Sequence, residues 1–551
     1  MDVASLPQLA RNTARFREVI GILAKYGLAR WMTRVHIDWV QRMFQDSEGQ
    51  PISELSTEQR IRHALTELGT TFIKLGQILS TRPDLVGPKL TAELTQLQAN
   101  APADAPDVVR NLIREELGQA PEELFSEFDE TAFASASIGQ VHAARLIDGT
   151  AVVLKIQHAG IEDRIRNDLE IMHRIAELAE QYSPELRQFR PVETTEEFSR
   201  TLMAELDFTR EQRNLQAFLR NFAGREDVKF PTPFVELSSR RVLTMERLDG
   251  ISVADCEALR KSTYDLSDIA HRGAHIFLDM IFRDGFYHAD PHPGNLMLLN
   301  GGVIGLLDGG MVGRIDELLR EQIEDMLLAA VRQDPVSLCD IIVRIGSLPP
   351  GLDDLRLRAE VESFLADYGS QTLSGFDLSG ALNDMTGIIR RYGIVLPVRV
   401  SLLIKVLVML EGTARNLDPD FSLAELLQPY QSTALRRRLS PQRMFNKLQR
   451  AWVDWTRLGE TLPRDIADLL NQIKRGRFDV HLEHRRLEQT VNRLVMGILS
   501  AALFIGSALL WSRNVPPQLW GISIPGSVGW FFALVLGFRL VKAIRHSGNI
   551  E

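Results

Sequence analysis

The segment from His288 to Asp308 carries the residue types that metal-dependent phosphoryl transfer needs. In the run HADPHPGN, Asn295 follows Asp290 by five residues, and Asp308 follows Asp290 by 18 residues at the end of an apolar stretch. In such chemistry one aspartate orients or deprotonates the attacking group, the asparagine binds Mg²⁺, and the second aspartate bridges the metal to the β- and γ-phosphates. We therefore predict that Asp290 is catalytic and that Asn295 and Asp308 are metal ligands. The alternative is a polar turn capped by these side chains, and we interpret His292 as structural.

A loop of small residues and a lysine precede this segment. The loop comprises Ala134, Ser135, Ala136, Ser137 and Ile138. Small side chains let backbone N–H groups approach a phosphate, and Lys155, 21 residues after Ala134, supplies a cation. We predict that the loop and Lys155 bind ATP. A carboxylate must hold the lysine, and the candidates are Glu205, Asp207 and Glu211; taken singly, each of these features is also typical of a solvated strand or an exposed helix face.

Hydrophobic period and turn signals predict the elements that position these residues. Three antiparallel strands are predicted at 132–137, 138–146 and 151–157, with a turn at Asp148-Gly149. Helices are predicted at 161–182 and 192–222, followed by a second strand pair formed by FVEL (234–237) and RRVLTMERL (240–248). A helix at 265–285 leads into the Asp290 segment, a turn follows at 300–302, and 315–480 is nearly all helical by its period.

The N-terminal region is predicted to be a helical extension, with helices at 1–45 and 56–98. In the second helix apolar residues recur at spacings of three and four, at Leu65, Leu68, Phe72, Leu75 and Leu79. Lys74 and Gln77 are three residues apart on another side of this helix and could reach into a cleft. The run APADAP at 101–106 is a linker to a further helix at 107–118.

The C-terminal end is predicted to cross a membrane twice. Leu494 to Ser512 are 19 residues without a charge, which span about 28 Å as a helix. A second, shorter apolar helix follows the turn at Pro516-Pro517. Basic residues flank the pair and only Arg513 lies between the helices, so both ends are placed in the cytoplasm. The alternative is a buried core pair. At the N-terminus no apolar stretch of the signal-peptide type is found.

Composition limits the remaining possibilities. The chain has 551 residues and a net charge of −9, but residues 431–493 hold an excess of seven basic residues, which we interpret as a neck that contacts anionic lipid head groups. The acidic part that precedes it argues against nucleic acid as a partner. The chain has two cysteines, 83 positions apart and outside any CxxC motif, which excludes a disulfide framework and a structural zinc site. Neither GxGxxG nor GxxxxGK[ST] occurs.

In their order, these motifs resemble the UbiB family of atypical protein kinase-like proteins, which is associated with ubiquinone and other isoprenoid-lipid metabolism. Lys74-Leu75-Gly76-Gln77 matches its KxGQ motif, the 134–138 loop matches its Ala-rich loop, and Glu205-Leu206-Asp207 matches its ExD motif. The resemblance implies that Glu211 pairs with Lys155, which makes both catalytic residues beside Asp290. It also implies regulatory roles for Lys74, Gln77, Glu205 and Asp207, because the family's KxGQ helix packs over the cleft and is thought to block protein substrates.

The resemblance implies an α+β, two-lobed kinase-like fold with an N-terminal helical extension, a largely helical C-terminal lobe and a transmembrane helix hairpin. The expected parts are an extension at 1–125, an N-lobe at 126–250, a C-lobe at 251–430, a basic neck at 431–493 and a hairpin at 494–545. Two departures stand out: Asp308-Gly309-Gly310 replaces the usual Asp-Phe-Gly, and Ala289 replaces the arginine that reads activation-loop phosphate in many kinases. Switching through that phenylalanine, and control by loop phosphorylation, are therefore not expected.

The function implied is that of a membrane-anchored kinase or ATPase that uses ATP and Mg²⁺ in support of quinone biosynthesis. It would hydrolyse ATP or phosphorylate a small lipid-linked substrate, in a bacterial inner membrane with its body on the cytoplasmic side, or in an organelle inner membrane. Expected partners are membrane lipids, prenylphenol or quinone intermediates and quinone-biosynthesis enzymes. The alternatives are a nucleotide- and lipid-binding pseudokinase scaffold, and a small-molecule kinase of the aminoglycoside or choline phosphotransferase type.

Overall fold

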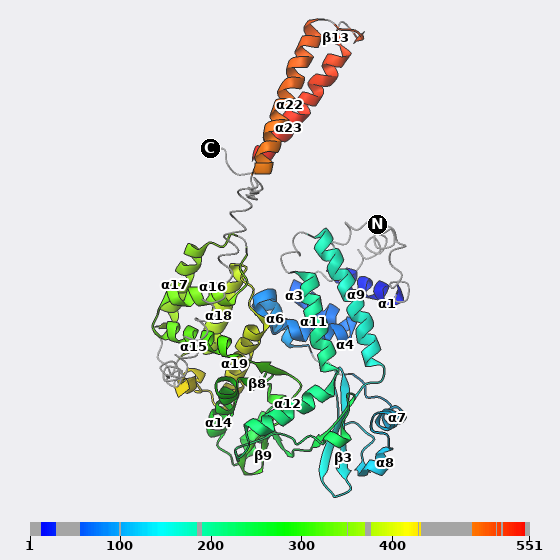
Figure 1. Cartoon of the computed structure of the whole chain (residues 1–551), viewed down its shortest axis with the longest axis vertical. Coiled ribbons are helices and arrows are strands. Elements are labelled where there is room, and N and C mark those ends of the chain that lie inside the picture. The colour runs from blue at the N-terminus through cyan, green and yellow to red at the C-terminus, as the bar shows by residue number, and fades with distance from the viewer. Residues whose placement is uncertain are drawn as a thin grey trace, which may run out of the picture. The chain divides into compact units, whose positions relative to one another are not determined.

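The computed structural model describes residues 13–28, 55–97, 101–183, 190–349, 351–369, 376–427, 429–430, 487–513, 515–519 and 522–545 (Figure 1). Most of the predicted helix at 1–45 and most of the basic neck lie outside the described residues. The chain divides into two compact units, Met1–Ser440 and Pro441–Glu551. The finer division into five parts stays a prediction.

A five-stranded antiparallel sheet carries the small-residue loop and Lys155. Its strands are β1 (Phe125–Phe128), β2 (Ala134–Ser135), β3 (Gly139–Leu146), β4 (Ala151–Gln157) and β6 (Val242–Glu246), in the order β1-β3-β4-β6 with β2 paired to β3. The predicted turn at Asp148-Gly149 joins β3 to β4, and Gly149 takes the left-handed φ of 91°. The predicted strand 132–137 is reduced to two residues.

The prediction of a strand at FVEL is wrong. Val235–Leu237 form the 3₁₀ turn η4, and β6 pairs with β4 instead. The hydroxyl of Ser238 donates to the carbonyl of Phe234 and accepts the N–H of Thr244. Because a side chain satisfies these backbone groups, the segment turns away from the strand ladder.

The helices of the N-terminal region are shorter than predicted. The segment 56–98 forms α3 (Thr57–Leu68), α4 (Thr70–Leu79), α5 (Pro83–Val86) and α6 (Pro88–Thr95), preceded by α1 (Thr13–Lys25). Gly69 has a φ of 92° and Gly87 a φ of 83°, and Pro83 and Pro88 each start a helix. A glycine in this conformation and a proline at a first turn both interrupt the hydrogen-bond ladder, so the single helix predicted there is wrong.

Two buried carboxylates attach α4 and α5 to the rest of the body. Asp168 accepts from Arg15 at 2.9 Å and from the hydroxyl of Thr71 at 2.7 Å, which joins α1 and α4 to α9 (Ile161–Tyr182). Asp84 pairs with Arg82 at 2.8 Å, and Arg82 also donates to the carbonyl of Leu396. The KxGQ helix is therefore held at both ends.

The segment 192–222 forms two helices, α11 (Pro191–Glu205) and α12 (Phe208–Asn221), instead of the one predicted. Asp207 leaves helical geometry at φ −108° and ψ 91° and accepts the N–H of Thr209 at 3.1 Å. It is the N-cap of α12. Two further helices, α7 (Pro106–Leu117) and α8 (Pro121–Leu124), precede β1.

The remainder of this unit is mainly helical and packs around the segment that bears Asp290. Its helices are α13 (Cys256–Lys261), α14 (Leu266–Leu278) with the π-helical turn η5 (Asp279–Asp284), α15 (Glu317–Val331), α16 (Pro335–Ile345), α17 (Asp354–Gly369), α18 (Leu378–Arg391) and α19 (Val398–Leu417). Short strands complete it: β5 (Val228–Lys229), β7 (Gly250–Ser252), β9 (Leu296–Leu299) and β10 (Ile304–Leu306) form one sheet, and β8 (Phe286–His288) pairs with β11 (Val312–Arg314). One large apolar core joins these helices to the strands.

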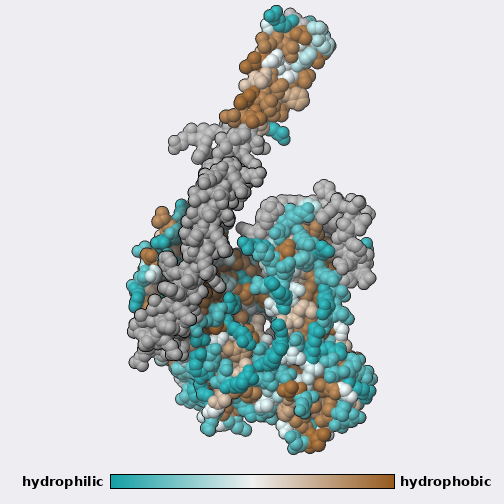
Figure 2. Space-filling view, in the orientation of Figure 1, coloured by the Kyte–Doolittle hydropathy of each residue, from teal (hydrophilic) through white to brown (hydrophobic). Residues whose placement is uncertain are grey.

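The second unit is an antiparallel pair of apolar helices, α22 (Leu487–Ser512) and α23 (Ile524–Arg545). The hydroxyl of Ser500 donates to the carbonyl of Ala533 at 2.9 Å, and Trp511 donates to Ser527 at 3.3 Å. Figure 2 shows that the exposed surface of this pair is largely hydrophobic. Among the described residues one helix, Leu494–Ser512, is long and apolar enough to cross a membrane, and the apolar part of the second, Ile524–Leu540, is shorter. That the pair spans a membrane stays a prediction.

Candidate active site

Lys155, Glu211 and Asp308 converge from three separate elements. The Nζ of Lys155 on β4 lies 2.8 Å from Glu211 Oε2 on α12 and 3.8 Å from Asp308 Oδ1. The side chain of Glu211 is 5% exposed and that of Lys155 is 25% exposed, so the lysine faces an opening. Of the three candidate carboxylates that the sequence left open, Glu211 is the one in contact with Lys155.

The charges of this cluster shift one another's protonation. Burial alone would lower the pKa of Lys155, but the carboxylates of Asp308 and Glu211 outweigh it and raise that pKa. Burial would raise the pKa of Asp308, yet Lys155 and the N–H of Gly310, which donates to Asp308 at 2.6 Å, hold it well below its usual range. Burial raises the pKa of Glu211 to about 7 against the opposing effect of Lys155. Asp308 is thus a stable carboxylate and Lys155 a stable cation, as phosphate and metal binding require.

His288 connects the two aspartates. Its Nδ1 accepts the backbone N–H of Asp290 at 3.1 Å, so its Nε2 carries the proton and donates to the carbonyl of Asp308 at 2.7 Å. Burial lowers the pKa of His288 and keeps the ring neutral. The sequence analysis gave this residue no role. Its position two residues before Asp290, at the end of an apolar run, is the signal that could have identified it.

Asn295 lies beside Asp290, in the spacing that the motif predicts. Its Nδ2 donates to the backbone carbonyl of Asp290 at 3.1 Å and to its carboxylate at 3.0 Å. Both contacts use the amide nitrogen, which leaves the amide oxygen for a metal. No group of three or more His, Cys, Asp or Glu suited to a metal occurs among the described residues. Asp308 and Asn295 supply two hard oxygens, which fits Mg²⁺ completed by phosphate and water.

The small-residue loop is a tight turn held by two residues that the sequence analysis missed. The N–H of Ala136 donates to the carbonyl of Gly139 at 2.9 Å. His158 lies 3.0 Å from the carbonyl of Ala136 and 3.2 Å from the carboxylate of Asp104. The side chains of Ser137 and Ile138 are buried, whereas Ala134 and Ala136 are exposed and Ser135 is half-buried. The outer face of the turn is therefore backbone and small side chains.

Of the four predicted regulatory residues, Lys74 and Glu205 pair with each other, and Gln77 and Asp207 have other partners. Lys74 on α4 forms an ion pair of 2.7 Å with Glu205 on α11. Gln77 instead donates to the carbonyl of Leu97 at 3.1 Å. This contact differs from the expectation that Gln77 reaches into a cleft together with Lys74. Asp207 is occupied as the N-cap of α12. His292 accepts the N–H of Gly294 at 3.1 Å, as expected for a structural residue.

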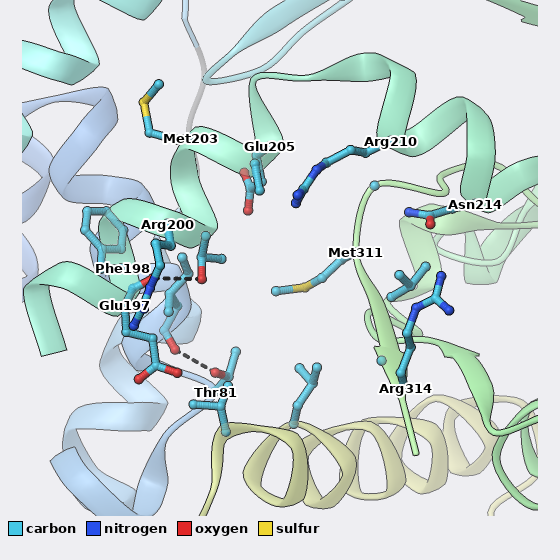
Figure 3. Close-up of a pocket in the computed structure, with 18 of the residues that line it drawn as sticks. Thr81, Glu197, Phe198, Arg200, Met203, Glu205, Arg210, Asn214, Met311 and Arg314 are labelled. Carbon is cyan, nitrogen blue, oxygen red and sulfur yellow. Dashed lines mark hydrogen bonds between the residues drawn. The ribbon is translucent and has the colours of Figure 1, made fainter. Parts of the chain in front are cut away.

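A large cavity of about 1370 Å³ lies beside the cluster of Lys155, Glu211 and Asp308 (Figure 3). Its walls come from α4, α5, α11, α12, the segment Gly310–Arg314 and the start of α19. Glu205 and Met311 point into it (Figure 3). Gly310, which lines the cavity, donates its N–H to Asp308 of the Lys155–Glu211–Asp308 cluster.

The sequence matches known families over most of its length. Residues 96–341 match the ABC1 atypical kinase-like domain, residues 361–422 the UbiB helical domain, and residues 481–546 the ABC1/UbiB kinase-like C-terminal domain. A protein encoded in the hydrogenase 1 5′ region of Clostridium pasteurianum is 31% identical, covering 97% of this chain and 99% of its own length. Among solved structures, the complex of Rv3197 with erythromycin from Mycobacterium tuberculosis has a TM-score of 0.46 and 24% identity, covering 71% of this chain and 97% of that one.

Several relatives are called probable protein kinase UbiB. That of Aeromonas salmonicida is 32% identical, covering 94% of this chain and 98% of its own. That of Marinobacter nauticus is also 32% identical, covering 88% of this chain and 90% of its own length. Identity at this level over nearly full length, together with the three domain matches, shows that the chain belongs to the UbiB family of ABC1 atypical kinase-like proteins.

Proposed function

We propose that the chain is a membrane-anchored kinase or ATPase that transfers the γ-phosphoryl group of Mg²⁺-bound ATP in support of ubiquinone biosynthesis. The observation that carries this proposal is that Lys155 lies beside both Glu211 and Asp308, and that His288 links Asp308 to Asp290. The names of the relatives supply the pathway and the kinase class. Binding of ATP and Mg²⁺ and anchoring in a membrane are themselves part of this proposal.

Each residue has a definite task in this scheme. Lys155, held by Glu211, neutralises the phosphates of the nucleotide, and the turn Ala134–Ile138 covers them with its backbone. Asp308 and Asn295 would hold the magnesium ion, which would supply positive charge to the phosphates. Asp290 orients the attacking water or hydroxyl and accepts its proton. As the new P–O bond forms, the bond between the γ-phosphorus and the bridging oxygen breaks and ADP leaves.

The short connection after Asp308 favours a small substrate over a protein. Asp316 already caps α15 eight residues after Asp308, and β11 occupies three of the residues between them. A protein kinase needs a longer segment here to bind its peptide substrate. The helix α4, which is paired with α11 through Lys74 and Glu205, also lines the cavity that Gly310–Arg314 lines, and this limits the room for a peptide. We therefore propose that the acceptor is water or a small lipid-linked molecule.

The test is ATP turnover by the full chain in lipid nanodiscs, with Asp290→Asn compared with Asp163→Asn, an exposed aspartate of α9. We expect Asp290→Asn to lower Mg²⁺-dependent turnover at least a hundredfold and to retain ATP binding, while Asp163→Asn matches the wild type. Unchanged turnover and unchanged cellular quinone in Asp290→Asn would instead support a pseudokinase scaffold. A screen of small metabolites as phosphoryl acceptors tests the small-molecule kinase alternative.

The apolar helix pair and the basic neck support the proposed location. Leu494–Ser512 is long enough to cross the hydrocarbon core, and Lys and Arg flank the pair on both sides. We propose an integral protein of the bacterial inner membrane whose kinase-like body faces the cytoplasm. Anionic head groups, prenylphenols and quinone-biosynthesis enzymes are its proposed partners.

A further inference from the structure

The cavity beside Lys155, Glu211 and Asp308 combines an apolar wall with arginines that have no carboxylate partner among the described residues. Its apolar side chains include Leu75, Leu79, Phe198, Met203 and Met311. Its volume of about 1370 Å³ exceeds the range of about 300–1,000 Å³ typical of small-molecule sites. Leu75 and Leu79 are only half-buried, so the packing of the body leaves them partly uncovered in the cavity. An elongated apolar group would cover this wall.

Arginines dominate the polar part of the lining. Three of them are neutralised: Arg82 by Asp84, Arg240 by Glu162 and Arg399 by Asp316. Five others have no carboxylate partner among the described residues, namely Arg200, Arg210, Arg213, Arg220 and Arg314. Three acids also line the cavity, but Glu205 is paired with Lys74 and Asp207 caps α12. Only Glu197 remains to oppose the five cations.

Two of the arginines lie apart from the apolar side chains of α11. Figure 3 shows Phe198 and Met203, from α11, on one side together with Arg200, and Arg210 and Arg314 on the side where Met311 lies. Arg210 and Arg213 are three apart on α12, where like charges repel one another. An anion with several oxygens would remove this repulsion and accept charge-assisted hydrogen bonds from more than one guanidinium.

We propose that this cavity binds an amphiphile with one long apolar chain and a phosphate or diphosphate head. The chain lies along α4 and α11, and the head is held by Arg210 and Arg314, with Arg213 beside them. This deepens the proposed function, because it names the ligand class of a site next to the catalytic cluster, but binding at this site does not require turnover. A bare phosphate would leave the apolar wall uncovered, and a neutral chain would leave the arginines unpaired.

The site is positioned to influence the catalytic residues through α12. Arg210 and Asn214 line the cavity, while Glu211, between them in sequence, faces Lys155. Asn214 donates to the carbonyl of Gly309 at 2.9 Å, directly after Asp308. A ligand held by Arg210 would therefore stabilise the helix that holds Glu211 and the segment that holds Asp308.

The test uses farnesyl diphosphate as the probe, with farnesol and inorganic diphosphate as its two halves. Binding to the full chain in phosphatidylcholine nanodiscs is measured by equilibrium dialysis without nucleotide or Mg²⁺, and binding to empty nanodiscs is subtracted. We expect farnesyl diphosphate to bind at least tenfold more tightly than either half. Arg210→Gln/Arg314→Gln should lower its affinity at least tenfold and leave farnesol binding unchanged. The matched control Arg114→Gln/Arg260→Gln removes two exposed arginines outside the cavity and should bind like the wild type.

Three results would overturn the proposal. Inorganic diphosphate could bind as tightly as farnesyl diphosphate, the double variant could bind like the wild type while keeping its thermal stability, or Lys155→Met could abolish binding, which would place the probe in the catalytic cleft. A benzophenone analogue of the probe adds a positional readout: crosslinks in α4, α11 or α12 support the site, and crosslinks confined to α22 and α23 contradict it. If the wild type binds the probe but hydrolyses no ATP, the proposed function fails and this site stands.

Discussion

The ammonium of Lys74 lies 2.7 Å from the carboxylate of Glu205, and both side chains are 21% exposed. This pair joins α4, the helix with the KxGQ motif, to α11, the helix with the ExD motif. Two residues after Glu205, Asp207 caps α12, which in turn holds Glu211 against Lys155. A contact outside the Lys155–Glu211–Asp308 cluster is thus connected to it through one short stretch of chain.

A double-mutant cycle on Lys74→Met and Glu205→Gln measures how strongly the two helices are coupled. Because both groups are partly exposed, we expect a coupling of about 0.5–1 kcal/mol in unfolding free energy. We also expect the single and double variants to change ATP turnover by the same factor, since each breaks the same contact. Additive effects on turnover would show that the two residues act independently.

The glycine of the KxGQ motif is explained by packing. A Cβ on Gly76 would lie 2.2 Å from Leu97 and 3.0 Å from Leu65, both buried leucines. Gly76→Ala should therefore destabilise the protein by about 1–3 kcal/mol, through overpacking between α4 and its neighbours. Gly412, inside α19, has open space around it, so Gly412→Ala should stabilise by about 0.5–1 kcal/mol. Thermal unfolding of the two variants should show shifts of opposite sign; a rise in melting temperature for Gly76→Ala would contradict this account.

Long periodic elements and short motifs could be predicted from the sequence. The helix predicted at 161–182 matches α9 at both ends, and the turn at Asp148-Gly149 was found because its residues suit that backbone. The breaks inside 56–98 could not be seen from the period, because the apolar residues on either side of Gly69 stay in phase. The strand predicted at FVEL failed because a side chain, Ser238, decides the backbone path there.

In the candidate site, too, some features could be predicted from the sequence and others could not. The spacing of Asp290, Asn295 and Asp308 is enough to predict them as site residues, because they lie within a short stretch of chain. Which carboxylate meets Lys155 depends on where α11 ends and α12 begins, at the cap that Asp207 provides. Asp104 and His158 are 54 positions apart, so only the folded structure reveals that they hold the small-residue loop.

The buried ring of His288 makes stability depend on pH. Burial lowers its pKa below the ordinary 6.5, so its contribution to stability is present above pH 6.5 and is lost as pH falls, by up to about 1.4 kcal/mol per pH unit. Glu211, whose pKa is raised to about 7, acts in the opposite direction in the same range, because its contribution is lost as pH rises. The comparison must therefore be made between His288→Gln and the wild type.

We expect the stability difference between His288→Gln and the wild type to shrink as pH falls from 7 to 5, because glutamine keeps a donor near Asp308 and does not titrate. Thermal unfolding across this range measures it. A stability difference that is independent of pH would mean that His288 is protonated as easily in the folded protein as in the unfolded chain.

Substitutions at the two proposed metal ligands, Asp308 and Asn295, should have different signatures. Asp308→Asn removes the carboxylate that faces Lys155 and should abolish Mg²⁺-dependent ATP turnover. Asn295→Ala should raise the Mg²⁺ concentration needed for half-maximal turnover by about tenfold, because one ligand of the ion is lost. Magnesium titrations at saturating ATP check both, with Asn300→Ala, an exposed residue of the next turn, as the control. An unchanged magnesium requirement in Asn295→Ala would remove this residue from the metal site.

Truncation tests whether the apolar helix pair anchors the protein. A chain ending at Ser440 keeps the whole first unit and lacks α22 and α23, so it should appear in the soluble fraction after an alkaline carbonate wash, whereas the full chain should stay with the membrane. A single substitution at Leu503, at the middle of the Leu494–Ser512 segment, tests the same point without removing any residues. An arginine there costs about 2.5–3.5 kcal/mol in membrane insertion, so Leu503→Arg should lower the membrane-bound fraction without altering the first unit. Retention of the truncated chain in washed membranes would instead place the attachment in the first unit, and the helix pair would then need another role.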